Sequence, residues 1–182
     1  MARLLLFLVL FTLAYADKVD GRSALHNFVY YEQYDDALKL LKHDVDVDVD
    51  AENAAGLTSL HIAIKKRDLK MAALLLEYGA EIDAQDNNGN TPLILAVKKK
   101  NIKLIRFLIL RGADVNLENY EGITPLHQAA FGGSPVVVEY LLDVGADNTI
   151  KSNSGYSAFD FAVHKNNLAV IDVLILYEKE HK

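Results

Sequence analysis

The 182-residue sequence contains no cysteine and no tryptophan. Without cysteine the protein cannot form disulfides, thiolate metal sites, iron–sulfur clusters or a cysteine nucleophile. Proline is scarce, and the 19 basic residues are outnumbered by 25 acidic ones, for a net charge of -6. This balance excludes a nucleic-acid binder that is held by bulk positive charge. Hydrophobic residues make up 51% of the chain, which suffices for one packed core without cross-links.

Sequence motifs of the common enzyme classes are also missing. The chain has no G-x-x-x-x-G-K-[ST], G-x-G-x-x-G, G-x-S-x-G or H-E-x-x-H. The segment Gly132-Gly133-Ser134-Pro135 lacks the lysine and the preceding strand of a phosphate loop, and we interpret it as a loop between two helices. We therefore expect a protein that is not an enzyme and that carries no cofactor and no metal.

One long apolar run is present, at the N-terminus. Arg3 provides a positive start, the run extends from Leu4 to Leu13, and Ala14-Tyr15-Ala16 has the small-x-small pattern that signal peptidase cleaves. A buried helix or a membrane anchor is the alternative, but the run is well short of the ~20 residues that a bilayer span needs. Residues 1–16 are therefore predicted to be a signal peptide, so that the mature protein is exported without a membrane span and is either secreted or periplasmic.

A 33-residue period organises the rest of the chain. Glycines recur at this spacing within similar segments, which begin at Gly56, Gly89, Gly122 and Gly155. A second marker returns at the same interval, in Gly79-Ala80, Gly112-Ala113 and Gly145-Ala146. Such regular self-similarity predicts a repeat protein.

Each repeat is predicted to contain two helices. Hydroxyl N-caps precede the first helix at Thr58, Thr91, Thr124 and Ser157. Pro92 and Pro125 occupy the first helical position, where the missing N–H costs nothing. The second helix carries apolar residues at helical spacing and ends at Gly79, Gly112 or Gly145, because glycine tolerates the left-handed conformation of a helix terminus.

These features resemble the ankyrin repeat, which has this same period and whose first helix begins T-P-L-H-x-A. The resemblance implies an all-α ankyrin-repeat solenoid of helix-turn-helix units. It covers four clear repeats, at 50–82, 83–115, 116–148 and 149–182, the last of which includes the C-terminal cap. Residues 17–49, with Ser23-Ala24-Leu25-His26 near their start, are interpreted as a degenerate N-terminal capping repeat. Atypical end repeats are expected because the outermost units have no neighbour on one side.

Two groups of residues are candidates for a metal site. His61 and His127 are two repeats apart, and stacked helices lie ~10 Å apart, so these histidines cannot share an ion. The resemblance implies instead that the histidine of this motif is a hydrogen-bonding group. The alternating carboxylates from Asp44 to Asp50 suggest a calcium loop, but Val49 and Ala55 stand where that loop needs glycine and glutamate. A solvated acidic turn is the alternative interpretation of this segment.

The resemblance also implies where a partner would bind, because ankyrin proteins commonly use the turn tips and the inner, concave surface. The inner positions near the ends of the first helices are Lys65, Lys66, Lys98, Lys99, Phe131, Gly132, His164 and Lys165. The turn tips contribute Gln85, Asp86, Asn87, Glu118, Tyr120, Glu121, Asn153 and Tyr156. Cations near a helix C-terminus also complement the helix dipole, so the lysines have a structural explanation as well.

The sequence thus predicts an exported scaffold that binds a protein partner, one with acidic residues, on a concave ankyrin surface. Two alternatives stay open: a periplasmic accessory protein that supports or protects an exported enzyme, and a calcium-dependent binding protein that uses Asp44 to Asp50. No sequence feature indicates nucleic-acid binding or self-association, so a monomer is expected.

Overall fold

The computed structural model describes residues 23–44 and 46–181. The predicted signal peptide, residues 1–16, lies outside the described residues. Within the described ranges the regular secondary structure is helical, with one isolated antiparallel bridge between Lys151 and Ser157. None of these described helices is long and apolar enough to cross a membrane. The predicted all-α fold class is confirmed.

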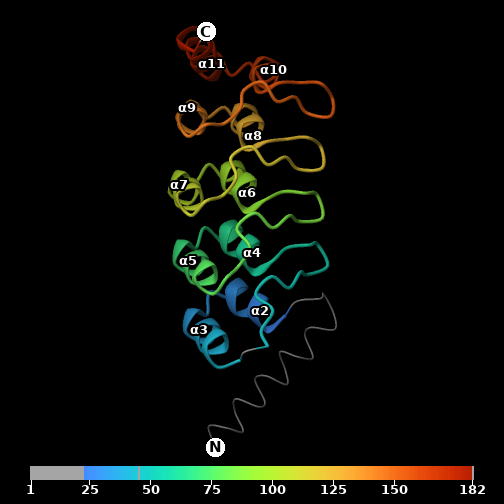
Figure 1. Cartoon of the computed structure of the whole chain (residues 1–182), viewed down its shortest axis with the longest axis vertical. Coiled ribbons are helices and arrows are strands. Elements are labelled where there is room, and N and C mark those ends of the chain that lie inside the picture. The colour runs from blue at the N-terminus through green and yellow to red at the C-terminus, as the bar shows by residue number, and fades with distance from the viewer. Residues whose placement is uncertain (1–22, 45, 182) are drawn as a thin grey trace, which may run out of the picture. The chain divides into compact units, whose positions relative to one another are not determined.

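The chain divides into two compact units, with the boundary between Asn87 and Asn88. The first unit contains two helix pairs: α2 (Ala24–Tyr30) with α3 (Tyr34–His43), and α4 (Ser59–Lys66) with α5 (Leu69–Glu77). Helices α2 and α4 pack side by side, as the first helices of successive repeats do (Figure 1). The predicted capping repeat is therefore a true helix pair, α2 and α3.

The second unit contains three helix pairs. These are α6 (Pro92–Lys98) with α7 (Ile102–Leu110), α8 (Pro125–Gly132) with α9 (Pro135–Asp143), and α10 (Ala158–His164) with α11 (Leu168–Glu180). First helices pack in the order α6, α8, α10, and α9 packs on α11. Between successive pairs, loops 111–124 and 144–157 project away from the second helices, and we call these loops fingers (Figure 1).

The predicted helix starts are confirmed. Thr58, Thr91, Thr124 and Ser157 all adopt extended backbone angles, and each side chain accepts a hydrogen bond from the backbone N–H three residues later. Ser23 does the same for α2, where it forms a capping box with His26. Each cap satisfies one of the N–H groups that a helix leaves without an internal partner.

Helix ends follow two repeating rules. Helices α5, α7 and α9 end two residues before a glycine with positive φ, at Gly79 (φ 88°), Gly112 (φ 95°) and Gly145 (φ 96°). The loop from a first helix to the second helix of the same pair contains another residue with positive φ. The residue type at this position differs between repeats. Gly133 takes this position in one repeat, but Arg67 and Lys100 take it in others. A side chain in that conformation costs free energy that glycine avoids.

The core lies between the first and second helices of each pair and, within each unit, between neighbouring pairs. Leu60, Met71 and Leu75 are fully buried in the first unit, and Leu93, Leu104 and Leu126 are fully buried in the second. Burial of each such side chain contributes about 1.5–3 kcal/mol. The packed core therefore holds the fingers and the first helices, which present the candidate site, in fixed positions within each unit.

Candidate functional site

The predicted inner positions occupy equivalent places at the ends of the first helices. Lys65 and Lys66 end α4, Lys98 and Lys99 close α6, Phe131 and Gly132 end α8, and His164 and Lys165 close α10. All of these residues except Gly132 are exposed. Lys65 and Lys66 belong to the first unit, whereas the other inner positions belong to the second.

Two of the predicted basic residues already contact other side chains of their own unit. Lys66 Nζ lies 3.7 Å from Glu32 Oε1 and 4.5 Å from the centre of the Tyr30 ring. Lys165 Nζ lies 4.2 Å from the centre of the Phe131 ring. These contacts are typical of exposed ion pairs and cation–π pairs, which each contribute little to stability. The two cations are thus oriented by their neighbours, and a partner would have to compete with these contacts.

Hydrogen bonds join neighbouring turn tips within each unit. In the first unit, the Asn87 backbone N–H donates to Ala55 O at 3.2 Å, and its side-chain amide donates to Ala54 O at 3.0 Å. In the second unit, the Asn153 amide donates to Tyr120 O at 2.9 Å. These hydrogen bonds connect neighbouring tips within each unit.

The predicted tip residues differ in exposure. Asn87, Glu118, Tyr120, Glu121, Asn153 and Tyr156 are exposed, and Gln85 is partly buried. Asp86 is not a surface residue, because only 6% of it is exposed. It occupies the same position of the repeat as Asn53 and Asn119, whose side-chain oxygens accept hydrogen bonds from the backbone of their own turns. The expectation that Asp86 belongs to the contact surface is therefore wrong.

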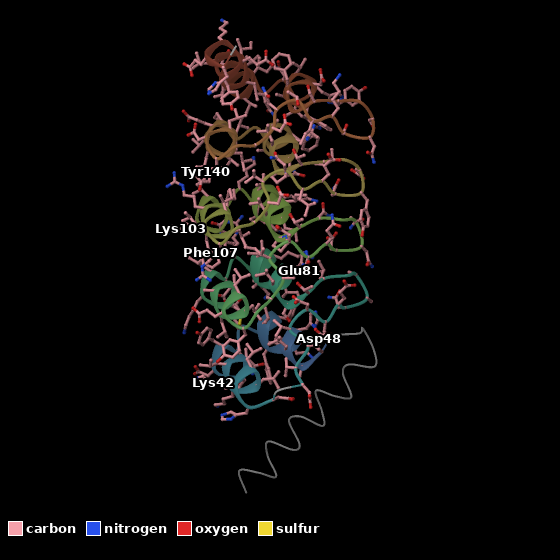
Figure 2. The ribbon with its side chains drawn as sticks, viewed as in Figure 1. Lys42, Asp48, Glu81, Lys103, Phe107 and Tyr140 are labelled. Atoms are coloured by element: carbon pink, nitrogen blue, oxygen red, sulfur yellow. The ribbon has the colours of Figure 1, made fainter. Side chains whose placement is uncertain are left out.

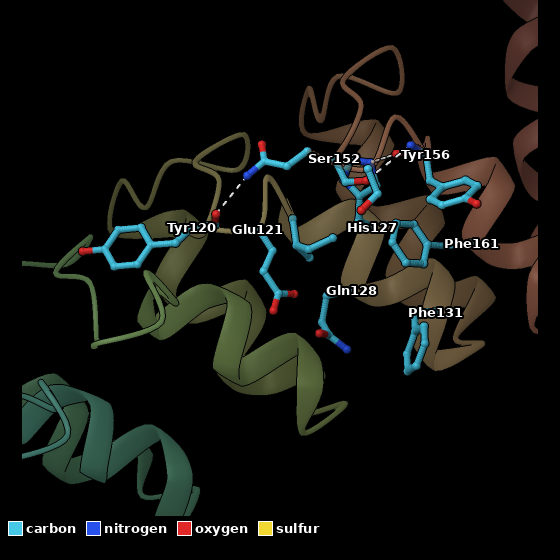
Figure 3. Close-up of a pocket in the computed structure, with 11 residues that line it drawn as sticks. Tyr120, Glu121, His127, Gln128, Phe131, Ser152, Tyr156 and Phe161 are labelled. Carbon is cyan, nitrogen blue, oxygen red and sulfur yellow. Dashed lines mark hydrogen bonds between the residues drawn. The ribbon is translucent and has the colours of Figure 1, made fainter.

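A groove of about 650 Å³ lies in the second unit between the fingers and the first helices (Figure 3). One side is formed by the tips of the two fingers, with Tyr120, Glu121 and Ile123 from the first finger and Ser152, Asn153, Ser154 and Tyr156 from the second. Helices α8 and α10 contribute His127, Gln128, Phe131 and Phe161. Five of the predicted contact residues, Tyr120, Glu121, Phe131, Asn153 and Tyr156, thus line one groove.

Aromatic rings gather around Phe161 at one side of this groove. Its ring centre lies 5.6 Å from that of His127, 6.2 Å from that of Phe131 and 6.2 Å from that of Tyr156, all in edge-to-face orientation. Figure 3 shows these rings together, with the Tyr120 ring at the opposite end of the groove. Phe131 and Tyr156 remain 45% and 56% exposed. Rings held in this way present apolar surface at low entropic cost.

The sequence analysis did not identify Gln128 and Phe161 as site residues. Both occupy the x position of the T-P-L-H-x-A motif in successive repeats, where Ile62 and Leu95 of other repeats are buried. The repeat register therefore contained a signal for them, since this position lies beside the motif histidine on the first helix. A glutamine and a phenylalanine at that position distinguish the groove from the other repeats.

His127, which lines the groove, is held by hydrogen bonds at both of its ring nitrogens. The Thr124 backbone N–H donates to His127 Nδ1 at 3.2 Å, so Nδ1 is an acceptor, and Nε2–H donates to Tyr156 O at 3.1 Å. His26 Nε2 makes the equivalent bond to Leu57 O, at 2.8 Å, in the first unit. Burial lowers the pKa of His127, and its hydrogen bond to Tyr156 opposes that shift. The hydrogen-bonding role that the resemblance implies is what the geometry shows.

The acidic segment forms local turns. Asp44 Oδ1 accepts the Asp46 backbone N–H, and Asp48 Oδ1 accepts that of Asp50, both within about 3 Å of the donor. Asp50 Oδ1 accepts the Glu81 backbone N–H at 2.9 Å. Across the residues that the structure describes, no three histidine or acidic side chains are grouped so that they could hold a metal ion. Carboxylates of the segment thus serve as hydrogen-bond acceptors for the backbone.

Comparison with known proteins identifies the family. The model of ankyrin repeats in three copies matches residues 2–86, 25–119 and 93–182, which together cover nearly the whole chain. A comparison with curated proteins gives no match. Ankyrin repeats generally serve as protein–protein interaction modules, and the family is typically non-enzymatic. With its regular repeat register, paired helices and capping histidines, the chain belongs to the ankyrin repeat family.

Proposed function

We propose that this chain is an exported, non-enzymatic scaffold that binds a protein partner through the inner ends of its first helices and its turn tips. The observation that carries the proposal is the groove of about 650 Å³ in the second unit, where Phe131 and Tyr156 are half exposed. Exposed aromatic rings in a concave, preformed site are typical of the residues that dominate binding energy.

The aromatic cluster favours a protein partner over a small metabolite. The groove is open to solvent along the fingers, and three of its polar side chains, those of His127, Ser152 and Asn153, already bond to the fold. A site for a small polar ligand would instead need several convergent polar groups that lack partners. A partner that inserts an apolar side chain between Phe131 and Tyr156 would bury both rings.

The lysines define the second part of the proposal, a partner with acidic residues. Lys65 and Lys98 are exposed at equivalent positions, one in each unit. Charges at the rim of an interface mainly raise the association rate, and their effect falls as salt increases. We therefore expect the groove to set the dissociation rate and these lysines to set the salt dependence of association.

Export is the third part of the proposal, and it rests on residues 1–16 of the sequence. N-terminal sequencing of the protein from its native host tests it. A mature N-terminus at Asp17 supports export, and recovery of intact Met1 from the cytoplasm contradicts it.

Affinity capture with the chain as bait, followed by mass spectrometry, tests the binding function. The captured partner is then measured against a groove variant, Phe131→Ala with Tyr156→Ser, and a matched control, Leu110→Ala with Val136→Ala. Leu110 and Val136 are 82% and 60% exposed on second helices, so the control removes exposed apolar surface elsewhere in the same unit. Loss of at least about 2 kcal/mol of binding energy is expected for the groove variant alone. Equal binding by both variants contradicts the groove as the site.

A charge-reversal pair tests the role of the lysines. Lys65→Glu with Lys98→Glu is compared with Lys42→Glu with Lys103→Glu, which makes the same change in net charge on α3 and α7. In each unit Figure 2 shows the control residue on the side of the second helices. The first pair should slow association and flatten its salt dependence, whereas equal effects of the two pairs would contradict a directional role.

A further inference from the structure

The fourth repeat exposes apolar residues at positions that are buried in the third. Val163 of α10 is 51% exposed, whereas Ala130, at the same position of the preceding repeat, is fully buried. Ile175 of α11 is 38% exposed, whereas Leu142 at the same register is only 3% exposed. In the third repeat these positions are covered because α10 and α11 pack over α8 and α9. On the side that does not contact the third repeat, the fourth repeat therefore exposes apolar residues, Val163 and Ile175.

A continuous stripe on α11 extends this face. Leu168, Asp172, Ile175 and Lys179 are separated by four, three and four residues, which places them along one side of the helix. Leu168 is 64% exposed, and both charged residues are exposed. Helix α11 has 13 residues whereas α5, α7 and α9 have nine, and its additional turn carries Lys179.

A repeat face that is exposed to solvent is normally polar, because apolar residues there reduce solubility. We call Val163, Leu168 and Ile175, with Asp172 and Lys179 beside them, the α11 face. Exposed apolar side chains with charged residues beside them are typical of an association surface.

The charges on the α11 face indicate what covers it. Asp172 comes three residues before Ile175 and Lys179 comes four residues after it, so opposite charges lie on either side of the apolar centre. If two copies of α11 cross in antiparallel orientation near Ile175, Asp172 of each copy faces Lys179 of the other. A two-fold axis requires this kind of self-complementary surface. A partner with one sign of charge would match only half of the face.

We propose that two copies of this chain associate through their α11 faces to form an isologous dimer. This inference does not depend on the groove, and it differs from the monomer that the sequence analysis expects. Ile175 lies at the centre of the interface, and Val163 and Leu168 contribute apolar area around it. The two ion pairs between Asp172 and Lys179 of the opposite copy fix the antiparallel register.

Sedimentation equilibrium of the purified chain over a range of concentrations gives the first test. A reversible monomer–dimer equilibrium is expected, with Ile175→Glu monomeric at concentrations where the native chain is dimeric. Leu110→Glu, which also places a carboxylate at an exposed apolar position of a second helix, should leave the dimer unchanged. The helical circular dichroism signal and the urea midpoint of Ile175→Glu show that the variant is folded. A native chain that stays monomeric, or open-ended larger assemblies, would overturn the proposal.

Charge exchange tests the register. Asp172→Lys alone places two lysines opposite each other at both ends of the interface, and Lys179→Asp alone places two aspartates there. Each variant should dimerise at least about tenfold more weakly than the native chain. The double variant, with both changes in one chain, should recover the native dimerisation constant, and a mixture of the two single variants should form heterodimers. If neither combination restores association, the antiparallel pairing is wrong.

Discussion

The Nε2 atom of His127 lies 3.1 Å from the carbonyl oxygen of Tyr156, which joins the helix cap of one repeat to the finger of the next. Through this bond the residue that caps α8 also fixes the backbone of Tyr156, whose ring lines the groove. The Thr124 N–H donates to the other ring nitrogen, so the geometry is that of the neutral imidazole. The His127 side chain thus takes part in helix capping, in repeat stacking and in shaping the groove.

The first prediction concerns pH. Because burial lowers the pKa of His127 below its ordinary value of 6.5, the unfolded chain binds a proton more readily than the folded chain. The contribution of neutral His127 to stability is therefore complete above that value and falls as the pH drops toward the folded pKa. Urea midpoints of the native chain should decrease from pH 7.5 to 5.5 by more than those of His127→Gln, whose side chain does not titrate. Parallel pH profiles for the two proteins would contradict this prediction.

The second prediction concerns Ser59, which starts α4 where Pro92 and Pro125 start α6 and α8. Its buried hydroxyl has no hydrogen-bond partner, and the preceding residue, Thr58, has the extended backbone that proline requires before it (ψ 169°). Ser59→Pro should raise the free energy of unfolding by about 0.5–1 kcal/mol, because it restricts the unfolded chain and removes the unpaired group. Ser59→Ala, which only removes the hydroxyl, should gain less. A lower urea midpoint for the proline variant would show that the first turn of α4 differs from those of α6 and α8.

The third prediction concerns the left-handed residue Lys100, whose φ is 53°. Gly133 takes the corresponding position one repeat later, with φ 70°. Lys100→Gly should therefore stabilise the chain by about 1 kcal/mol, since the steric cost of a side chain in this conformation is removed. The matched control is Lys100→Ala, which loses the charge but keeps Cβ and should not be stabilised. Equal urea midpoints for the two variants would mean that the turn carries no such strain.

The fourth prediction concerns Asn167, whose side-chain amide donates to Ala130 O at 2.7 Å. This bond satisfies a carbonyl at the end of α8 and ties it to the next helix pair. Asn167→Ala should lower the free energy of unfolding by about 1–2 kcal/mol. Asn167→Asp keeps the shape but has no donor, so it should lose at least as much. Unchanged stability in the aspartate variant would show that the contact acts through packing alone.

The repeat pattern of the sequence by itself determined the local structure. Thr58, Thr91, Thr124 and Ser157 were recognisable as helix starts, and Gly79, Gly112 and Gly145 as helix ends, because capping depends on groups within a few residues. The resemblance to ankyrin repeats, applied to the same register, indicated Phe131 and Tyr156 as candidate contact residues. Family membership follows from these short-range features, which recur in every repeat.

Only the tertiary structure decided which of these residues act together. Phe161 meets Phe131, His127 and Tyr156 because α10 packs on α8, and no local pattern specifies that contact. Asp86 looked like a surface contact in the sequence but is buried, whereas Lys66 is exposed and forms an ion pair with Glu32. The exposure of Val163 and Ile175 likewise depends on the fact that their repeat covers its neighbour without being covered in return. Burial is set by what packs against a residue, so it is decided between repeats rather than within one.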